Sequence, residues 1–394
     1  MVAEEEIPKD FQRTDVGVIP KEWFIDEMCN LSIIIDSLHQ TPKFSQIGFS
    51  MVRVSDIKTG DLILEETLKV SEHNYNLFTK NYKPKKGNIV LSRVGSYGVS
   101  SFVNTDEPFC LGQNTVVIEA KIDNRYLFYV LNSKSIRDQI ENESFGTGYK
   151  SLSLKNIKEL KIPLPPTKAE QTAIATALND ADKLINELEK LISKKKLIKQ
   201  GAMQELLRPK EGWEVKTLDE LTYCLDNLRV PLNDSQRLKM KGDFPYCGAN
   251  GVLDFINDYK INDNVILIAE DGGYFDEYLT RPIAYRMKGK FWVNNHAHIL
   301  KAKEGFSQTF IFYSLVHKNI LDHLASGTRA KLNKSEMYKI EVNTPSTEDE
   351  QNKISKILSD MDSEIESLEK KLDKYKMIKQ GMMQNLLTGK IRLI

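Results

Sequence analysis

The chain has 394 residues, which is too many for one compact core, so we expect two or more domains. Hydrophobic residues make up 41% and charged residues 28%, as in typical globular proteins. The 55 basic and 55 acidic residues cancel, so the total charge alone does not indicate a nucleic-acid partner.

The N-terminal stretch MVAEEEIPKD is acidic and lacks the apolar segment of a signal peptide. No run approaches the roughly 18 apolar residues of a membrane span, so we expect a cytoplasmic protein that does not enter membranes. The cysteines are scattered without a CxxC pair, which predicts reduced thiols and neither disulfides nor a metal site. They are Cys29, Cys110, Cys224 and Cys247.

Residues 1–166 form the first predicted domain. The run NIVLSRV (88–94) is β-like and is followed by a glycine turn, Gly95–Gly98. The polar pair Gln113-Asn114 precedes a second apolar run, TVVIEA. Five basic residues and no acid lie within 80–96, which predicts a basic face on this domain.

Residues 167–208 have the pattern of a long amphipathic helix. Thr167-x-x-Glu170 is typical of a capping box, and Pro165 prevents an earlier helix start. Apolar residues recur at alternating steps of three and four, which predicts a stripe that pairs with another helix. The stripe contains Leu178, Ala181, Ile185, Leu188 and Ile192, and it shifts toward Ile198 and Ala202 near the helix end.

Residues 209–345 form the second predicted domain and repeat the outline of the first. The β-like run NVILIAE (264–270) is followed by the glycine turn Asp271–Tyr274, and the polar stretch Asn294-Asn295-His296 precedes AHIL. Six basic residues and no acid lie within 281–303. Apart from these landmarks the two domains differ widely, which suggests one fold that reads two different targets.

Residues 346–388 repeat the first helix, and 389–394 form a short tail. An ungapped alignment of 170–207 with 350–387 gives 20 identities in 38 positions. The cap is repeated as Pro345, Thr347 and Glu350, and the stripe as Leu358, Met361, Ile365, Leu368, Leu372 and Tyr375.

Both helices end on nearly the same motif, LIKQGAMQELL at 197–207 and MIKQGMMQNLL at 377–387. Glycine inside a helix costs roughly 1 kcal/mol relative to alanine. Because this cost occurs at Gly201 and again at Gly381, we expect another backbone to approach closely at both positions. We therefore interpret the two motifs as equivalent docking points, each beside the start of the other helix.

Helices of about 40 residues span roughly 60 Å, and antiparallel pairing lets the chain return with short connections. The predicted fold class is therefore α+β. Two similar mixed α/β domains are joined by two long antiparallel coiled-coil helices in a pseudo-twofold arrangement. The alternative is two independent coiled coils that dimerise between chains.

The catalytic motifs that we searched for are absent. The chain has neither the GxxxxGK[ST] phosphate loop nor a GxGxxG turn. His296-x-His298 lacks a third metal ligand at a suitable spacing. Asp106, Glu119 and Lys121 only loosely match a nuclease carboxylate cluster. We therefore expect a non-catalytic protein without a metal site.

The repeated helices, from IPLPPTKAEQ at 162–171 to the second copy ending MIKQGMMQNLLTGK, resemble the specificity subunits of Type I restriction-modification systems. GKFWVNNHAHILK (289–301) resembles a stretch of one class of their target-recognition domains. The second copy departs from the pattern, since it has Asn343-Thr344-Pro345-Ser346 where the first has Pro-Leu-Pro-Pro.

The resemblance implies that each domain reads one half of a bipartite, asymmetric site in double-stranded DNA. The helix pair would set the spacer and dock two methyltransferase subunits, and through them two restriction-translocase subunits. No cofactor would be bound by this chain, whereas the assembled complex would use S-adenosylmethionine, ATP and Mg²⁺.

Amide, aromatic and basic side chains are the groups that contact bases and phosphates. The predicted DNA-binding residues are Lys83, Lys85, Lys86, Arg93, Ser96, Tyr97, Gln113, Asn114, Lys150, Tyr274, Asn294, Asn295, His296, Arg329 and Lys331. The predicted helix-pairing and docking residues are Leu178, Ile185, Leu188, Ile192, Gly201, Leu358, Ile365, Leu368, Leu372 and Gly381.

Three other functions stay open at this point. The chain could be a coiled-coil adaptor that binds proteins rather than DNA. It could be the specificity subunit of a related methyltransferase or nuclease system outside Type I. It could also be a fused enzyme that uses Asp106, Glu119 and Lys121.

Overall fold

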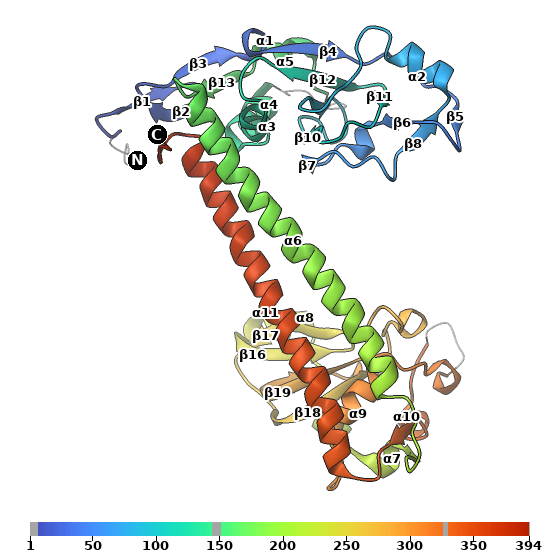
Figure 1. Cartoon of the computed structure of the whole chain (residues 1–394). Helices are drawn as coiled ribbons and strands as arrows, with labels where there is room; N and C mark the ends of the chain where they lie inside the picture. The colour runs from blue at the N-terminus through green and yellow to red at the C-terminus, as the bar shows by residue number, and fades with distance from the viewer. Residues whose placement is uncertain (1–6, 144–150, 326–329, 394) are drawn as a thin grey trace. The chain divides into compact units, whose positions relative to one another are not determined.

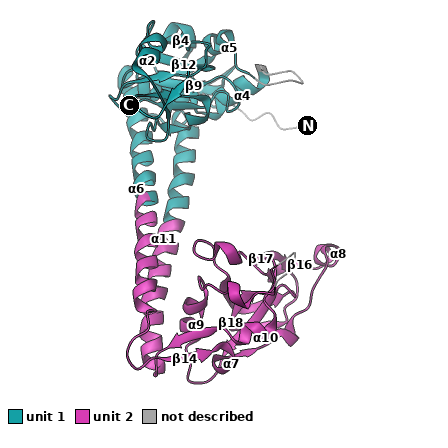
Figure 2. Cartoon of the chain, turned by 90° about the vertical axis from the view of Figure 1, so that its right-hand side faces the viewer, with its two compact units in different colours: residues 1–189, 370–394 teal, residues 190–369 magenta. Residues whose placement is uncertain are grey.

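The computed structural model describes residues 7–143, 151–325 and 330–393. The chain forms two compact units, one from residues 1–189 and 370–394 and the other from residues 190–369 (Figure 2). Each unit holds one domain and a stretch of both long helices (Figure 1). Among the described residues, no helix is both long enough and apolar enough to cross a membrane.

The first domain is built mainly from short strands. In chain order it contains β1 (Phe11–Thr14), β2 (Gly17–Pro20), β3 (Phe24–Glu27), α1 (Met28–Leu31), β4 (Ser32–Asp36), β5 (Phe44–Ser45), β6 (Phe49–Val52), the 3-10 turn η1 (Val54–Asp56), β7 (Gly60–Asp61), β8 (Leu68–Val70), α2 (Glu72–Phe78), β9 (Ile89–Ser92), β10 (Ser100–Phe102), β11 (Phe109–Leu111), β12 (Thr115–Ala120), α3 (Asn124–Leu131), α4 (Lys134–Glu143), α5 (Leu154–Glu159) and β13 (Lys161–Leu164).

The main sheet of this domain has the order β4-β12-β9-β10-β7, and a second sheet has the order β11-β6-β8-β5. The predicted runs at 88–94 and 115–120 are confirmed as the strands β9 and β12. All of β9 is buried, because the sheet is covered on both faces, and this explains its continuous apolar run. Asp123 caps α3 by accepting from the backbone N–H of Tyr126 at 2.9 Å, and α3 packs in the core beneath the sheet.

The second domain repeats this plan with longer strands. It contains β14 (Glu214–Thr217), α7 (Leu218–Leu221), β15 (Thr222–Cys224), the 3-10 turn η2 (Asp226–Leu228), α8 (Asp234–Lys239), β16 (Lys241–Gly248), β17 (Gly251–Ile256), β18 (Ile261–Ala269), the 3-10 turn η3 (Phe275–Glu277), β19 (Ala284–Val293), β20 (Ala297–Ala302), α9 (Gln308–Leu315), the 3-10 turn η4 (Leu321–His323), α10 (Lys334–Tyr338) and β21 (Glu341–Thr344).

Its sheet has the order β15-β20-β18-β19-β16-β17, and the first three strands correspond to β4-β12-β9 of the first domain. The small pair β14-β21 likewise corresponds to β3-β13, and both pairs lead into a long helix. Beyond this shared scaffold the two domains add different strands. The predicted combination of a common frame with different fillings is therefore observed.

The long helices are α6 (Lys168–Leu206) and α11 (Glu348–Leu386), 39 residues each. The threonine half of each predicted capping box is present, since Thr167 Oγ1 accepts from the N–H of Glu170 at 3.2 Å and Thr347 Oγ1 from that of Glu350 at 3.4 Å. The glutamate half is different. The carboxylate of Glu170 pairs with Arg392, and that of Glu350 accepts from the indole N–H of Trp213 at 3.2 Å.

Within each unit the two helices run antiparallel, which confirms the predicted pairing (Figures 1 and 2). In the first unit Lys376 Nζ lies 2.6 Å from Glu189 Oε1, and in the second Lys196 Nζ lies 2.7 Å from Glu369 Oε1. These two ion pairs join the same repeat positions with the roles of the helices exchanged. Both units therefore use the same register.

Most of the predicted stripe is buried. The fully buried members are Leu178, Ile185, Leu188, Ile192, Leu358 and Ile365, whereas Leu368 and Leu372 are half-buried. The predicted shift toward Ile198 is wrong, because 46% of this residue is exposed. Ala202 instead packs against the core of the second domain.

Candidate nucleic-acid interface

A groove on the first domain brings several of the predicted DNA-binding residues together. Ser96, Gln113 and Asn114 line a concavity of about 480 Å³, together with Gln40 and Arg53. Asn114 has a positive φ of 64°, which places it in the tight turn just before β12. The guanidinium of Arg53 already donates to both carboxylate oxygens of Asp56, at 3.1 and 3.0 Å. The three amide side chains of the groove can form paired hydrogen bonds with the edges of bases. We call this concavity the first-domain groove.

The predicted lysine loop of the first domain is exposed to solvent. Lys85 Nζ lies 2.5 Å from Glu119 Oε1, and Lys86 Nζ lies 3.6 Å from Asp106 Oδ2. Lys83 is exposed and has no carboxylate within ion-pair distance among the described residues. Lys83 therefore presents the least compensated charge of the three to a phosphate.

Arg93 and Tyr97 have hydrogen-bond partners inside the first domain, and their role as DNA contacts stays a prediction. Arg93 Nη1 donates to both carboxylate oxygens of Asp36 at 2.9 and 3.1 Å, and its Nε donates to the carbonyl of Leu152 at 3.1 Å. The hydroxyl of Tyr97 donates to Glu141 at 3.1 Å, and its ring packs on the core. Both side chains therefore help to stabilise the domain.

The candidate residues of the second domain fall into two groups. Asn295 is exposed, and His296 is 41% exposed with its Nδ1 2.7 Å from Asp271 Oδ1. Tyr274 is half-buried, with the guanidinium of Arg281 stacked 3.0 Å from its ring centroid. These side chains lie at the ends of β18 and β19–β20, as the corresponding residues of the first domain do.

The remaining candidates of the second domain are structural or lie outside the described residues. Asn294 is 5% exposed, and its Oδ1 accepts from the N–H of His296 at 2.8 Å, so it shapes the turn. Lys331 pairs with Glu270 at 3.0 Å. Lys150 and Arg329 lie outside the described residues.

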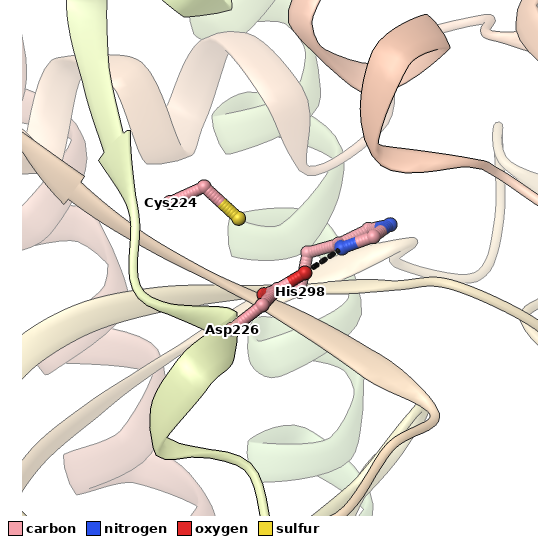
Figure 3. Close-up of side chains that lie close together, drawn as sticks. All are labelled: Cys224, Asp226 and His298. Carbon is pink, nitrogen blue, oxygen red and sulfur yellow. Dashed lines mark hydrogen bonds and ion pairs between the residues drawn. The ribbon is translucent and has the colours of Figure 1, made fainter.

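A buried ionic network below this surface was not predicted from the sequence. His298 is 1% exposed, and its Nδ1 lies 2.6 Å from Asp226 Oδ2 (Figure 3). Its Nε2 lies 2.8 Å from the carbonyl oxygen of Leu332. Arg229 pairs with both Asp226 and Glu270. The signals were an Asp two residues after a strand and a His on the neighbouring strand, which are too common to identify such a network.

The first domain contains the same arrangement with a different cation. Arg93 there joins Asp36, the last residue of β4, to the carbonyl of Leu152, and His298 likewise joins Asp226, two residues after β15, to the carbonyl of Leu332. Leu152 and Leu332 are 180 positions apart, as the two helix repeats are. The network is therefore a shared strut of the scaffold, formed by an arginine in one domain and a histidine in the other.

Cys224, Asp226 and His298 are the only described residues whose ligand atoms gather as a metal site would require, all within 4.8 Å of one another (Figure 3). Both ring nitrogens of His298 already have hydrogen-bond partners, Asp226 Oδ2 and the carbonyl oxygen of Leu332, so neither nitrogen is left to bind a metal. Burial opposes ionisation of Asp226, but the hydrogen bond and charge of His298 keep its pKa below the usual value. The contacts fit an ion-pair network.

The loosely nuclease-like residues of the first domain are not assembled into a cluster. Glu119 accepts from the hydroxyl of Tyr82 at 3.0 Å as well as pairing with Lys85. Lys121 donates to the carbonyl of Asn30 at 3.2 Å. The carboxylate of Glu119 is therefore used to stabilise the lysine loop.

The helix-end motifs expose apolar side chains at the same positions in both copies. Leu197 and Met377 are each 65% exposed, and Ile198 and Ile378 are 46% and 43% exposed. No heavy atom outside the helix lies within 4 Å of a Cβ placed on Gly201 or Gly381. The predicted close approach of another backbone is therefore not found within the described chain. We call Leu197, Ile198 and Gly201, and Met377, Ile378 and Gly381, the two apolar patches.

The chain is similar in sequence to known proteins. The family model described as the Type I restriction modification DNA specificity domain matches residues 25–200 and again 210–376. A type I restriction enzyme specificity subunit of Methanocaldococcus jannaschii, MjaX, is 27% identical over 98% of this chain and 97% of its own length. A second M. jannaschii specificity subunit, MjaIX, is 22% identical over 78% of each chain. A specificity subunit of Haemophilus influenzae is 37% identical over only 34% of each chain.

A solved structure has the same fold. The crystal structure of a Type I restriction-modification system S subunit from M. genitalium superposes with a TM-score of 0.66 at 20% identity, and the match covers 92% of this chain and 96% of that one. A chain from a structural study of type I R-M complex assembly and conformational transition superposes with a TM-score of 0.56 at 14% identity.

Proposed function

The chain belongs to the family of Type I restriction-modification DNA specificity subunits, and from this premise we propose that each of its domains reads one half of a bipartite, asymmetric DNA site. The observation that carries the proposal is the shared scaffold, β4-β12-β9 in one domain and β15-β20-β18 in the other, with different surroundings. Two domains that share one scaffold but present different surfaces would recognise two different DNA sequences. A palindromic site would instead require identical readers.

The helix pair then serves as the spacer and the docking surface. The two apolar patches have a similar composition and the same place in the repeat, so one kind of partner can bind at both. We infer that the partners are two methyltransferase subunits, through which two restriction-translocase subunits join the complex. A partner helix could pack closely over each glycine, which has no side chain, and contact the apolar side chains beside it.

This chain would supply recognition and no chemistry. In the complex, S-adenosylmethionine would serve methylation, and ATP with Mg²⁺ would serve restriction. Support for a non-catalytic role comes from the use of the candidate carboxylates Glu119, Asp226 and Glu270 in ion pairs. The chain would depend on its partners for every covalent step.

Sequencing of methylated DNA tests the proposal. The chain is expressed with a cognate methyltransferase subunit, and the methylated adenines are mapped with and without it. We expect methylation at two short, different half-sites separated by a fixed gap, and none when the chain is left out. A continuous palindrome, or methylation that persists without the chain, would contradict the proposal.

Two substitutions in the first domain separate phosphate contacts from base contacts. Lys83→Ala should weaken binding to all sequences alike and lower the slope of log affinity against log salt by about 1, because one phosphate contact is lost. Gln113→Ala in the first-domain groove should relax a single base position by about 1–3 kcal/mol. Competition binding with single-base variants of the site, at several salt concentrations, measures both effects.

Lys194, an exposed lysine of α6, is the matched control. Lys194→Ala should change neither the salt slope nor the base preference. If Lys83→Ala behaves like this control, the lysine loop lies outside the interface.

A further inference from the structure

A buried tyrosine of the first domain contacts both long helices. Tyr129, on α3, is 1% exposed, and its hydroxyl donates to Asp182 Oδ2 on α6 at 2.8 Å. Lys379 Nζ, on α11, lies 2.5 Å from the other oxygen of the same carboxylate and 5.8 Å from the centroid of the Tyr129 ring. The three side chains therefore connect the domain to both helices at one point.

The second unit contains the same contact. Tyr313, on α9, is 1% exposed, and its hydroxyl donates to Asp362 Oδ2 on α11 at 2.5 Å. Lys199, on α6, pairs with that carboxylate, and its Nζ lies 5.6 Å from the Tyr313 ring centroid. We call the two groups, Tyr129–Asp182–Lys379 and Tyr313–Asp362–Lys199, the clamps.

The clamps are equivalent, with the helices exchanged. Asp182 and Asp362 occupy the same repeat position, and so do Lys199 and Lys379, the lysines of the two KQG motifs. In each clamp the aspartate lies on the helix that follows the domain, and the lysine lies on the opposite helix. A tyrosine thus meets a complete clamp only where the two helices are paired in register.

The domain helices keep the tyrosine although they differ elsewhere. α3 reads NRYLFYVL and α9 reads QTFIFYSL, which share only phenylalanine, tyrosine and leucine. Burial and the adjacent Asp362 raise the pKa of Tyr313 to about 12, and burial beside Asp182 raises the pKa of Tyr129 further. Both hydroxyls are therefore protonated and can donate near neutral pH.

A second contact repeats beside each clamp. Gln171 Oε1 accepts from the N–H of Asp123, at the start of α3, at 3.3 Å. Gln351 Oε1 accepts from the N–H of Ser307, at the start of α9, at 2.8 Å. The N-terminus of α3 is therefore bound by α6, and that of α9 by α11. The tyrosine of each domain helix contacts both long helices. Together these contacts fix the direction of α3 and of α9.

We propose that the two clamps are positioning elements that hold each reading domain on the helix pair and so determine which spacer length the chain accepts. The inference rests on the proposed function. One extra base pair moves a half-site by about 3.4 Å along the DNA and by roughly 35° around it. A domain held at one point by a buried tyrosine and a half-buried ion pair rejects such a shift, whereas a loosened domain follows it.

Removal of the clamp hydroxyls tests this role. Tyr129→Phe and Tyr313→Phe keep the rings and delete one oxygen each. DNA substrates carry the preferred half-sites at the preferred spacer and at spacers one and two base pairs longer or shorter. We expect methylation at neighbouring spacers, relative to the preferred one, to rise about tenfold in either variant, with unchanged preference within each half-site. An equal loss of activity at all spacers would overturn the proposal.

Tyr126→Phe is the matched control. Tyr126 lies on the same helix, and its buried hydroxyl donates to the carbonyl of Pro163 at 2.8 Å, inside the domain. Loss of this hydroxyl should leave the spacer preference the same as in the parent chain. Lys199→Met removes the contribution of the opposite helix and should relax the spacer preference as Tyr313→Phe does. An unchanged preference in Lys199→Met would show that the opposite helix takes no part.

A measurement without DNA separates this inference from the proposed function. Amide hydrogen exchange in the free chain should become about tenfold faster in α3 for Tyr129→Phe and in α9 for Tyr313→Phe. Unchanged exchange would overturn the clamps whatever the DNA results are. Failure of the parent chain to direct methylation would contradict the proposed function and leave the exchange result valid.

Discussion

The double variant Gly201→Leu, Gly381→Leu is expected to be more stable than the parent chain and yet to fail in assembly with methyltransferase subunits. Both glycines lie inside long helices, and the space around them is open in the described structure. Leucine is a much better helix former, so each substitution should stabilise the free chain by about 0.8 kcal/mol.

Assembly should respond in the opposite direction. A side chain placed where a partner backbone packs over the glycine costs about 1–3 kcal/mol, which corresponds to roughly a 5- to 150-fold loss of affinity for each site. Thermal unfolding of the free chain measures the first effect, and titration with the methyltransferase subunit, followed by light scattering, measures the second. Loss of both sites should leave the chain monomeric.

Gln200→Leu, Gln380→Leu is the matched control, because these exposed residues precede the glycines directly and lie about 100° away around the helix. The control adds the same side chains and should assemble far better than the glycine variant. If the glycine variant assembles as well as the parent, the two apolar patches are not the docking sites. If it is less stable than the parent, the helices approach each other more closely there than the open space indicates.

Asp226→Ala is expected to destabilise the second unit by about 3–5 kcal/mol, because it removes the carboxylate partner of the buried His298 ring and one of the two carboxylate partners of Arg229. The Asp226 side chain is only 10% exposed, so water cannot replace the lost carboxylate. Urea unfolding followed by near-ultraviolet circular dichroism measures the loss. The first unit should unfold as in the parent, since its strut uses Arg93 and Asp36.

Asp258→Ala is the control for this variant, since Asp258 is 51% exposed and only 3.7 Å from Lys260. It should shift the urea midpoint very little. A loss in Asp226→Ala no larger than in this control would mean that water or another group neutralises the network.

The same network should make the second unit sensitive to acid. Although burial opposes ionisation, the pKa values of Asp226 and Glu270 lie below their usual 3.8 and 4.5, because of His298 for the former and of Arg229 and Lys331 for the latter. Depressed carboxyl pKa values add stability that is complete above the unfolded pKa values and is lost as pH falls through the folded ones. Between pH 6 and pH 3, the urea midpoint of the second unit should therefore fall more in the parent than in Glu270→Gln.

Local patterns in the sequence determined the elements of this fold. Thr167 and Thr347 mark the starts of both long helices, because capping depends on residues three positions apart. Apolar runs located β9 and the second half of β18, because a strand segment that is covered on both faces is apolar throughout. The duplication predicted that the two helices pair with each other, and the short connections predicted that they pair antiparallel.

The tertiary structure decided which of the polar residues are free for DNA. Arg93 and Gln113 look equally suitable in the sequence, yet Arg93 pairs with an aspartate 57 residues away, whereas Gln113 lines the first-domain groove. The clamps could not be predicted from the sequence either, because Tyr129 is 53 residues from Asp182 and much further from Lys379. Periodicity and capping depend on residues within one or two helical turns, so the sequence predicts them directly. The partner of a buried charge is determined only when distant segments of the chain pack together.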